Sequence, residues 1–259
     1  MIERRSFLSA LGGATLMPAS PLNQSNRQTR YYILHQYFLK NGTQLGRLHD
    51  YLGKSLLPVL EKRLPGPKIV MQALVAPHMP QLAAIYGVRS AEDYIGLHET
   101  LAADKEFARA LDAWEKGPEP PTEHYASWLL KATDYSPEIQ PPAKPPAAPR
   151  VFELRTYHSP SLWQLRALHE RFAGPEIKIF HRVGVHPLFY SETVFGPLKP
   201  NLTYLIPFDN LAEREKAWAR FGADPEWHKV RQESIDRSGQ IASIIQISLY
   251  TPTDYSPIR

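Results

Sequence analysis

The chain of 259 residues has an ordinary apolar fraction of 43%, a net charge of +4 and no cysteine. The lack of cysteine excludes disulfides, thiolate zinc sites, cysteine-ligated iron–sulfur clusters and a cysteine nucleophile. Positive and negative residues are interspersed rather than gathered into a basic tract, so the charge gives no reason to expect a nucleic-acid partner.

The N-terminus has the pattern of an export signal. The letters RRSFL at residues 4–8 resemble the bacterial twin-arginine motif, and a short apolar run and small residues follow them. We therefore expect residues 1–22 to be a signal peptide, residues 23–29 to be a flexible lead, and the protein to be periplasmic or extracellular. The alternative is a cytosolic tail with a chance arginine pair. No segment predicts a stable membrane span.

The rest of the chain repeats itself. Residues 30–137 and 150–257 align without a gap at an offset of 120 positions, most visibly in the pentapeptide Thr-Asp-Tyr-Ser-Pro that ends both copies. One register held over about a hundred residues indicates a duplication. We predict one domain at 30–138, a second at 150–259, and between them a proline-rich linker at 139–149 in an extended polyproline conformation.

Both copies show the same succession of strand and helix patterns. In the first copy we expect a strand at 31–39, a helix at 43–63, strands at 68–76 and 81–88, helices from a cap at Ser90 to Trp114 with an interruption at Asp104, and a strand at 125–133. In the second copy we expect a strand at 151–157, a helix at 161–180, strands at 186–195 and 201–208, helices from a cap at Asn210 to Asp236 with an interruption at Asp224, and a strand at 241–251.

This order, β-α-β-β-α-β, is the ferredoxin-like α+β unit, whose antiparallel sheet carries helices on one face only. The other face needs a cover, and the second copy supplies a similar sheet. We therefore predict that the two sheets pack face to face into a barrel of the dimeric α/β type within one chain. The protein would then be a monomer with an internal pseudo-dimer. The alternative is a homodimer in which two chains exchange halves.

The second copy resembles the NIPSNAP family in its letters VFELRTY at 151–157, LTYLIPFDNLAER at 202–214 and DPEW at 224–227. The first copy departs from this pattern, because YILHQY at 32–37 replaces the Glu-Leu-Arg core. The resemblance implies a dimeric α/β barrel, and it implies little chemistry because the family has no generally assigned activity. Related barrel families include haem-degrading and cofactor-free monooxygenases, haem peroxidases and small-molecule-binding proteins. Haem is therefore a candidate cofactor.

Strand alternation predicts which side chains meet between the sheets. If the apolar Phe152 and Leu154 face the helices, Glu153, Arg155 and Tyr157 point between the sheets. By the same rule, further candidates for this space are His35 and Tyr37 on the first strand, Gln72 and Glu192 at matched positions on the second strands, Tyr204, and Trp128 on a last strand.

A buried arginine and glutamate need partners or a bound ligand. One interpretation is a pocket for a small organic ligand, in which His35, Arg155 and Tyr157 are catalytic and the ligand is oxidised with or without haem. The other is a self-satisfied network, with Arg155 paired to Glu153 or Glu192, in a non-catalytic binding or interaction module.

The remaining histidines favour structural roles. His49 and His169 recur at matched positions on the first helices, where packing is favoured over a haem ligand or a general base. His181 and His186 are five residues apart across a turn, and no H-E-x-x-H motif is present, so no metal site is expected.

Overall fold

The fold is taken from a computed structural model that describes residues 28–144 and 146–259. The expected signal peptide at 1–22, and the expected lead as far as residue 27, lie outside the described residues. Export therefore stays a prediction. Within the described ranges, no helix is long and apolar enough to cross a bilayer.

The elements follow the predicted order in both copies. The first copy contains β1 (Tyr31–Phe38), a long helix divided into α1 (Gln44–Asp50), a π-helical stretch η2 (Tyr51–Leu56) and α2 (Leu57–Arg63), then β2 (Lys68–Val75), β3 (Gln81–Val88), α3 (Ala91–Ala103), α4 (Lys105–Glu115) and β4 (His124–Ala132). The second copy contains β5 (Val151–His158), α5 (Leu162–Arg171), η3 (Phe172–Glu176), α6 (Ile177–Val183), β6 (Phe189–Phe195), β7 (Asn201–Phe208), α7 (Leu211–Gly222), α8 (Pro225–Ser238) and β8 (Ile244–Pro252).

Side-chain caps set the helix boundaries where the sequence predicted them. The Ser90 hydroxyl accepts the Asp93 N–H at 3.2 Å, and the Asp93 carboxylate accepts the Ser90 N–H at 3.0 Å, which completes a capping box at the start of α3. The Asp104 carboxylate accepts the Phe107 N–H at the start of α4, and the Asp224 carboxylate accepts the Trp227 N–H at the start of α8, so each helical segment restarts at an aspartate.

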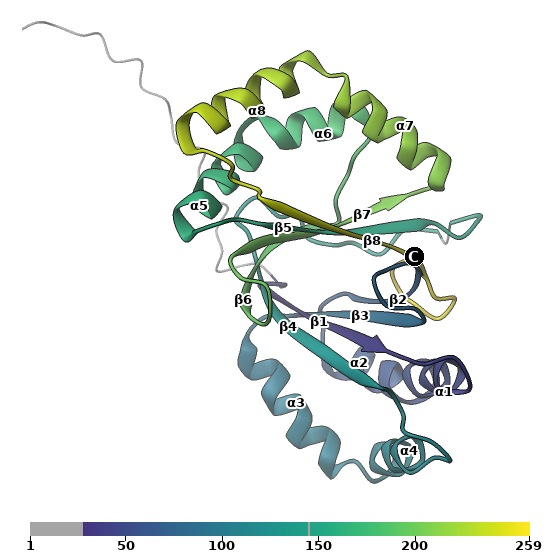
Figure 1. Ribbon diagram of the computed structural model, residues 1–259. Helices are drawn as coiled ribbons and strands as arrows, with labels where there is room; N and C mark the ends of the chain where they lie inside the picture. The colour runs from purple at the N-terminus through teal and green to yellow at the C-terminus, as the bar shows by residue number, and fades with distance from the viewer. Residues whose placement is uncertain (1–27, 145) are drawn as a thin grey trace, which may run out of the picture.

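The strands form one closed barrel in the order β1-β3-β2-β8-β5-β7-β6-β4, and β4 pairs back onto β1. The α+β barrel prediction is confirmed, and the structure adds that the two sheets are joined edge to edge. The joints are β2 with β8 and β4 with β6, which we call the β2–β8 seam and the β4–β6 seam. Figure 1 shows the barrel between two helical layers, α1 to α4 on one side and α5 to α8 on the other.

The repeated pentapeptide fastens each seam, because it follows the last strand of one copy and hydrogen-bonds to the second strand of the other copy. The bonds are Thr133 N–H to Tyr190 O at 3.0 Å and Tyr190 N–H to Ser136 Oγ at 3.0 Å at the β4–β6 seam, and Thr253 N–H to Val70 O at 2.9 Å and Val70 N–H to Ser256 Oγ at 3.0 Å at the β2–β8 seam. We call this arrangement the clasp.

Apolar side chains from both copies pack inside the barrel, where the Tyr32 and Phe189 rings stack with centroids 4.4 Å apart. Phe152 and Leu154 belong to this interior cluster, so the predicted assignment of faces is wrong. Both faces of each sheet are buried. Alternation divides the side chains between two faces but does not say which face is the barrel interior and which lies under the helices. The charged side chains of β5 find hydrogen-bonding partners under the helices, and Phe152 and Leu154 therefore face the interior.

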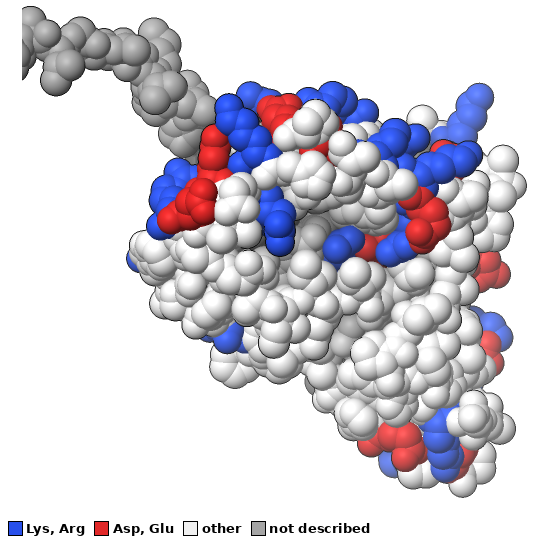
Figure 2. Space-filling model, turned by 45° about the horizontal axis from the view of Figure 1, so that its top comes forward, with Lys and Arg blue, Asp and Glu red and all other residues white. Residues whose placement is uncertain are grey.

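On the surface shown in Figure 2, blue and red groups are interspersed over the helices, and a broad band between them carries few charges. This mixed pattern agrees with the interspersed charges of the sequence.

Candidate functional site

Glu153 and Arg155 lie under α7, and Tyr157 lies against Phe172 of η3, so none of the three points into the barrel. The fully buried Glu153 carboxylate accepts hydrogen bonds from Arg155 Nη1 at 2.8 Å and from Arg214 Nε at 2.6 Å. It accepts a further hydrogen bond from Trp218 Nε1 at 3.0 Å, and the Arg155 guanidinium lies 4.1 Å from the centre of the Trp218 ring. Two arginines and an indole therefore satisfy this carboxylate, as the self-satisfied interpretation predicted for Glu153.

The predicted tyrosines of the second copy belong to the core under the helices. The Tyr157 and Tyr204 rings lie 5.4 Å apart within a cluster of aromatic side chains. Burial raises the pKa of both phenols, so both stay protonated at neutral pH. Their position gives no ligand direct access from the barrel interior.

His35 lies under α3, in the opposite helical layer from Arg155, so the predicted meeting of these two side chains is wrong. Its Nδ1 contacts Ser127 Oγ at 2.7 Å and its Nε2 contacts Tyr94 OH at 2.8 Å. Burial lowers the pKa of His35 to about 4, with His98 acting in the same direction. The imidazole is neutral and both nitrogens have partners. Tyr37 packs in the same layer, where burial raises its pKa.

Among the predicted candidates, Trp128 faces the barrel interior and packs against the interior cluster. Gln72 and Glu192 point the other way, towards the helices, where each meets the histidine of its own copy. Gln72 and Glu192 are the two of these candidates that line a seam pocket.

At the β2–β8 seam, His49 is held from both sides. Its Nδ1 contacts Tyr255 OH at 2.8 Å and its Nε2 contacts Gln72 Oε1 at 3.0 Å. Burial raises the pKa of Tyr255 to about 12, so the phenol is protonated. The histidine and the glutamine line a pocket of about 400 Å³ together with Leu74, Thr251, Thr253 and Asp254.

At the β4–β6 seam, the matched residues form a similar but less complete arrangement. Tyr135 OH contacts His169 Nδ1 at 2.8 Å, and His169 Nε2 lies 3.6 Å from Glu192 Oε2, beyond hydrogen-bond length. Nε2 is buried and has no hydrogen-bond partner among the described residues. The pocket here measures about 350 Å³ and is lined by Lys131, Ala132, Thr133, Asp134, Tyr135, His169, Glu170, Ala173 and Glu192.

Electrostatics keep Glu192 ionised. Its contact with His169 lowers the pKa of the carboxyl group below the usual range, and Lys131 and Lys199 act in the same direction. Burial raises the pKa of Tyr135, so this phenol is protonated. The pocket thus brings together a carboxylate, an imidazole with one open nitrogen and a neutral phenol.

Comparisons with known proteins fit this architecture. The NIPSNAP family model matches residues 152–257, from β5 to the end of the second clasp. The second copy therefore matches the NIPSNAP family over nearly its whole length. A search of curated protein sequences finds no match to the chain.

Solved structures share the fold of the whole chain. An anthrone oxidase-like protein is 14% identical, with a TM-score of 0.54 over 87% of this chain and 92% of its own. A candidate monooxygenase from Fusobacterium nucleatum is 6% identical, with a TM-score of 0.55 over 86% and 92%. An uncharacterised NIPSNAP-like domain protein from Burkholderia xenovorans is 26% identical, with a TM-score of 0.36 over 42% and 89%. At these identities the two long matches establish the fold alone.

The β4–β6 pocket needs both copies. His169 and Glu192 come from the second copy, which matches the NIPSNAP model, whereas Tyr135 comes from the clasp of the first copy. Sequence reasoning assigned the two histidines to packing and did not use the clasp tyrosines as site residues. The signal was present, because histidine, glutamine or glutamate, and tyrosine all recur at the offset of 120.

The hydrogen bonds of the histidines decide which of them could bind a cofactor metal. His35 and His49 have both ring nitrogens engaged, so His169 Nε2 is the nitrogen of these three histidines that could ligate haem iron. His181 and His186 stack with ring centroids 5.0 Å apart. Across residues 28–144 and 146–259, no group of three or more His, Asp or Glu side chains could hold a metal ion.

Proposed function

We propose that the protein binds a small organic molecule in the β4–β6 pocket and removes a proton from it, with His169 as the general base. The observation that carries the proposal is the Nε2 of His169, a residue that lines the pocket. This nitrogen is buried beside a carboxylate and has no hydrogen-bond partner among the described residues. A buried polar atom without a partner is rare in folded proteins and indicates a missing ligand or water. The site lies on the outer face of the barrel, not between the sheets.

The surrounding residues suit this role. With a proton on Nδ1 that donates to Tyr135, His169 presents its Nε2 lone pair to a ligand hydroxyl or acidic C–H group. Tyr135 is the positioning residue, since it fixes the ring and its tautomer. Once the proton has moved to Nε2, the imidazolium faces Glu192 at 3.6 Å. Because this carboxylate is partly exposed, we assign it about 1 kcal/mol of stabilisation.

The fold supports an extension of this chemistry to oxidation. Deprotonation turns an activated phenol or ketone into an electron-rich anion that can react with dioxygen. The names of two structural neighbours, a candidate monooxygenase and an anthrone oxidase-like protein, point to oxidations. We therefore propose cofactor-free monooxygenation as the activity to assay, with anthrone as the first substrate. In this assay one molecule of anthrone and one of dioxygen give anthraquinone and water.

The test uses 4-nitrophenol, whose absorbance reports its ionisation, at a pH below its own pKa. The wild-type protein should bind the probe as its phenolate, and His169→Gln should lose the phenolate band. The matched control is His49→Gln, which should keep it because His49 has no open nitrogen. Equal loss in both variants would contradict the role of His169. Binding of the neutral probe alone would favour the non-catalytic binding module.

The haem alternative has a separate readout. Haem added to the purified protein should give a shifted Soret band if His169 ligates iron, and His169→Gln should abolish the shift. A flat titration, together with oxygen uptake on anthrone, would favour the cofactor-free reaction.

We also propose that the protein is exported through the twin-arginine route and works as a single-chain barrel. Support comes from the RRSFL letters at 4–8 and from the pairing of all eight described strands within one chain. Replacing Arg4 and Arg5 by lysine should retain the precursor in the cytoplasm of a bacterial host. Light scattering after gel filtration should give the mass of one chain, and twice that mass would indicate exchanged halves.

A further inference from the structure

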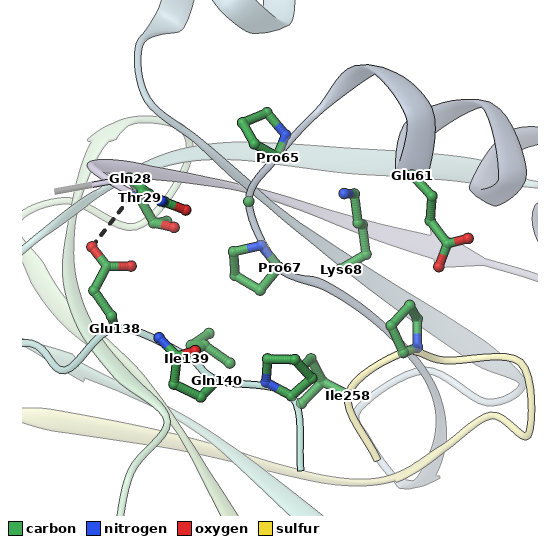
Figure 3. Close-up of a pocket in the computed structure, with 13 residues that line it drawn as sticks. Gln28, Thr29, Glu61, Pro65, Pro67, Lys68, Glu138, Ile139, Gln140 and Ile258 are labelled. Carbon is green, nitrogen blue, oxygen red and sulfur yellow. Dashed lines mark hydrogen bonds between the residues drawn. The ribbon is translucent and has the colours of Figure 1, made fainter. Parts of the chain in front are cut away.

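One end of the barrel holds a cavity of about 660 Å³, separate from the seam pockets (Figure 3). Ile139 and Ile258, which belong to the interior cluster, line it together with prolines such as Pro67. Two carboxylates, Glu61 and Glu138, also line it. The cavity wall therefore combines an apolar part, made by the isoleucines and prolines, with an almost equal share of polar and charged groups.

Lys68, the first residue of β2, lies on the wall of this cavity and is only 6% exposed. Its ammonium group donates a hydrogen bond to the Leu64 carbonyl at the end of α2. An ammonium group has three N–H donors, and burial of a charged amine is costly unless its donors are satisfied. A cation in this position therefore needs an explanation.

The second copy shows that the fold does not require it. Leu188 occupies the matched position and packs against the interior cluster. The preceding helix there ends on Gly184 at φ 92°, and Val185 N–H donates to Phe180 O at 2.8 Å. In the second copy a glycine cap ends the helix and a leucine fills the matched position, whereas in the first copy Lys68 binds the Leu64 carbonyl. A buried amine at this position is therefore not a general requirement of the fold.

The surroundings make Lys68 easier to deprotonate than an exposed lysine. Burial lowers the pKa of Lys68, and the opposing influence of Glu61 is smaller. The charged groups that face it across the cavity are Glu61 on α2 and Glu138 after the first clasp, whose Oε1 accepts the Thr29 N–H at 3.3 Å. Desolvation of a lysine beside a cavity is a common way to obtain a nucleophilic amine.

We propose that Lys68 is a reactive amine that condenses with an aldehyde or ketone carrying an apolar body, bound in the barrel-end cavity. Lysine Nζ attacks the carbonyl carbon, a proton moves from nitrogen to oxygen, and loss of water leaves an imine. The reaction is R–CHO plus lysine–NH2 giving R–CH=N–lysine plus H2O, and no electrons are transferred. The carboxylates of Glu61 and Glu138 are the groups available to move the protons. This site is independent of His169.

The test is trapping with benzaldehyde and sodium cyanoborohydride, which reduces the imine to a stable secondary amine. Peptide mapping at low conversion should place the label on Lys68 several-fold ahead of Lys62, the exposed lysine of α2. The preference should grow as the pH falls below that at which surface lysines react. Equal labelling of the two lysines would overturn the proposal.

Matched variants separate the loss of the reactive amine from the loss of the fold. Lys68→Leu copies the residue of the second copy and should lose the adduct, whereas Lys62→Met should keep it. Lys68→Arg preserves the cation and the bond to Leu64 but should not react. Thermal unfolding checks each variant. His169→Gln should label like wild type, which separates this site from the proposed function. An adduct that persists in Lys68→Leu would also overturn the proposal.

Discussion

The two seams of the barrel have the same construction and differ at one nitrogen atom. At both, a clasp brings a tyrosine from one copy against a histidine of the other. At the β2–β8 seam Gln72 occupies His49 Nε2 at 3.0 Å, whereas at the β4–β6 seam Glu192 stands 3.6 Å from His169 Nε2 and leaves it open. Both copies need the clasp because it closes the barrel. The second-strand residue, Gln72 or Glu192, could change in each copy independently.

A wider contrast separates the first strands of the two copies. In the second copy a buried carboxylate binds Arg155 and Arg214, and in the first copy the matched position is the apolar Ile33. His35 there has neutral partners. The copies therefore reach the same fold with a charged network on one side and a neutral network on the other.

The largest expected effect comes from breaking the charged network. Glu153→Leu leaves Arg155 and Arg214 without their shared carboxylate under α7 and should cost about 3–5 kcal/mol of unfolding free energy. Chemical denaturation measures the loss. Glu215→Ala, which removes an exposed partner of Arg214, is the control and should stay within about 0.5 kcal/mol of wild type. A small loss in Glu153→Leu would mean that the network is not needed for stability.

The clasps should be energetically alike. Ser136→Ala and Ser256→Ala each remove the acceptor of a buried backbone N–H, on Tyr190 and Val70 respectively, and each should cost about 1–3 kcal/mol. The same denaturation measurement compares them directly. Losses that differ by more than the width of this range would show that the two seams do not share the closure of the barrel equally.

A smaller effect on stability is expected from a substitution that frees His49 Nε2 at the β2–β8 seam. Gln72→Ala removes the amide from His49 Nε2 at a stability cost of about 0.5–1.5 kcal/mol. It should raise the number of 4-nitrophenolate molecules bound per chain from one to two. Calorimetric titration measures this number, and His49→Gln in the same background should return it to one. An unchanged count would show that the open nitrogen is not what distinguishes the seams.

The smallest effect concerns pH. The folded pKa of Glu192 is lower than its ordinary value of 4.5, so the carboxylate stabilises the fold above that pH. This contribution should be lost as the pH falls from about 4.5 through the folded pKa, and partial exposure keeps it below about 1 kcal/mol. Unfolding curves of wild type and Glu192→Gln should diverge above this window and converge below it. Parallel curves would contradict the ionised state of Glu192.

Periodicity and caps determined much of the fold in advance. The strand and helix order, the capping residues Ser90 and Asn210, and the restarts at Asp104 and Asp224 depend on neighbours within a few residues, and all are present. The faces of the strands were inverted, because Glu153 and Arg155 alternate with Phe152 and Leu154 whichever side is inside. The seam residues Gln72 and Glu192 were recognised as site candidates, but they were placed between the sheets, whereas they lie under the helices.

The sequence by itself determined the duplication, its register and the succession of elements, since these are properties of spacing along one chain. Only the tertiary structure decided that the sheets join at their edges, that the charged residues lie under the helices, and that Tyr135 meets His169. Each of these depends on which surfaces of two distant segments are buried together. A repeat at an offset of 120 names the matched residues, and only closure of the barrel shows that each histidine takes its tyrosine from the other copy.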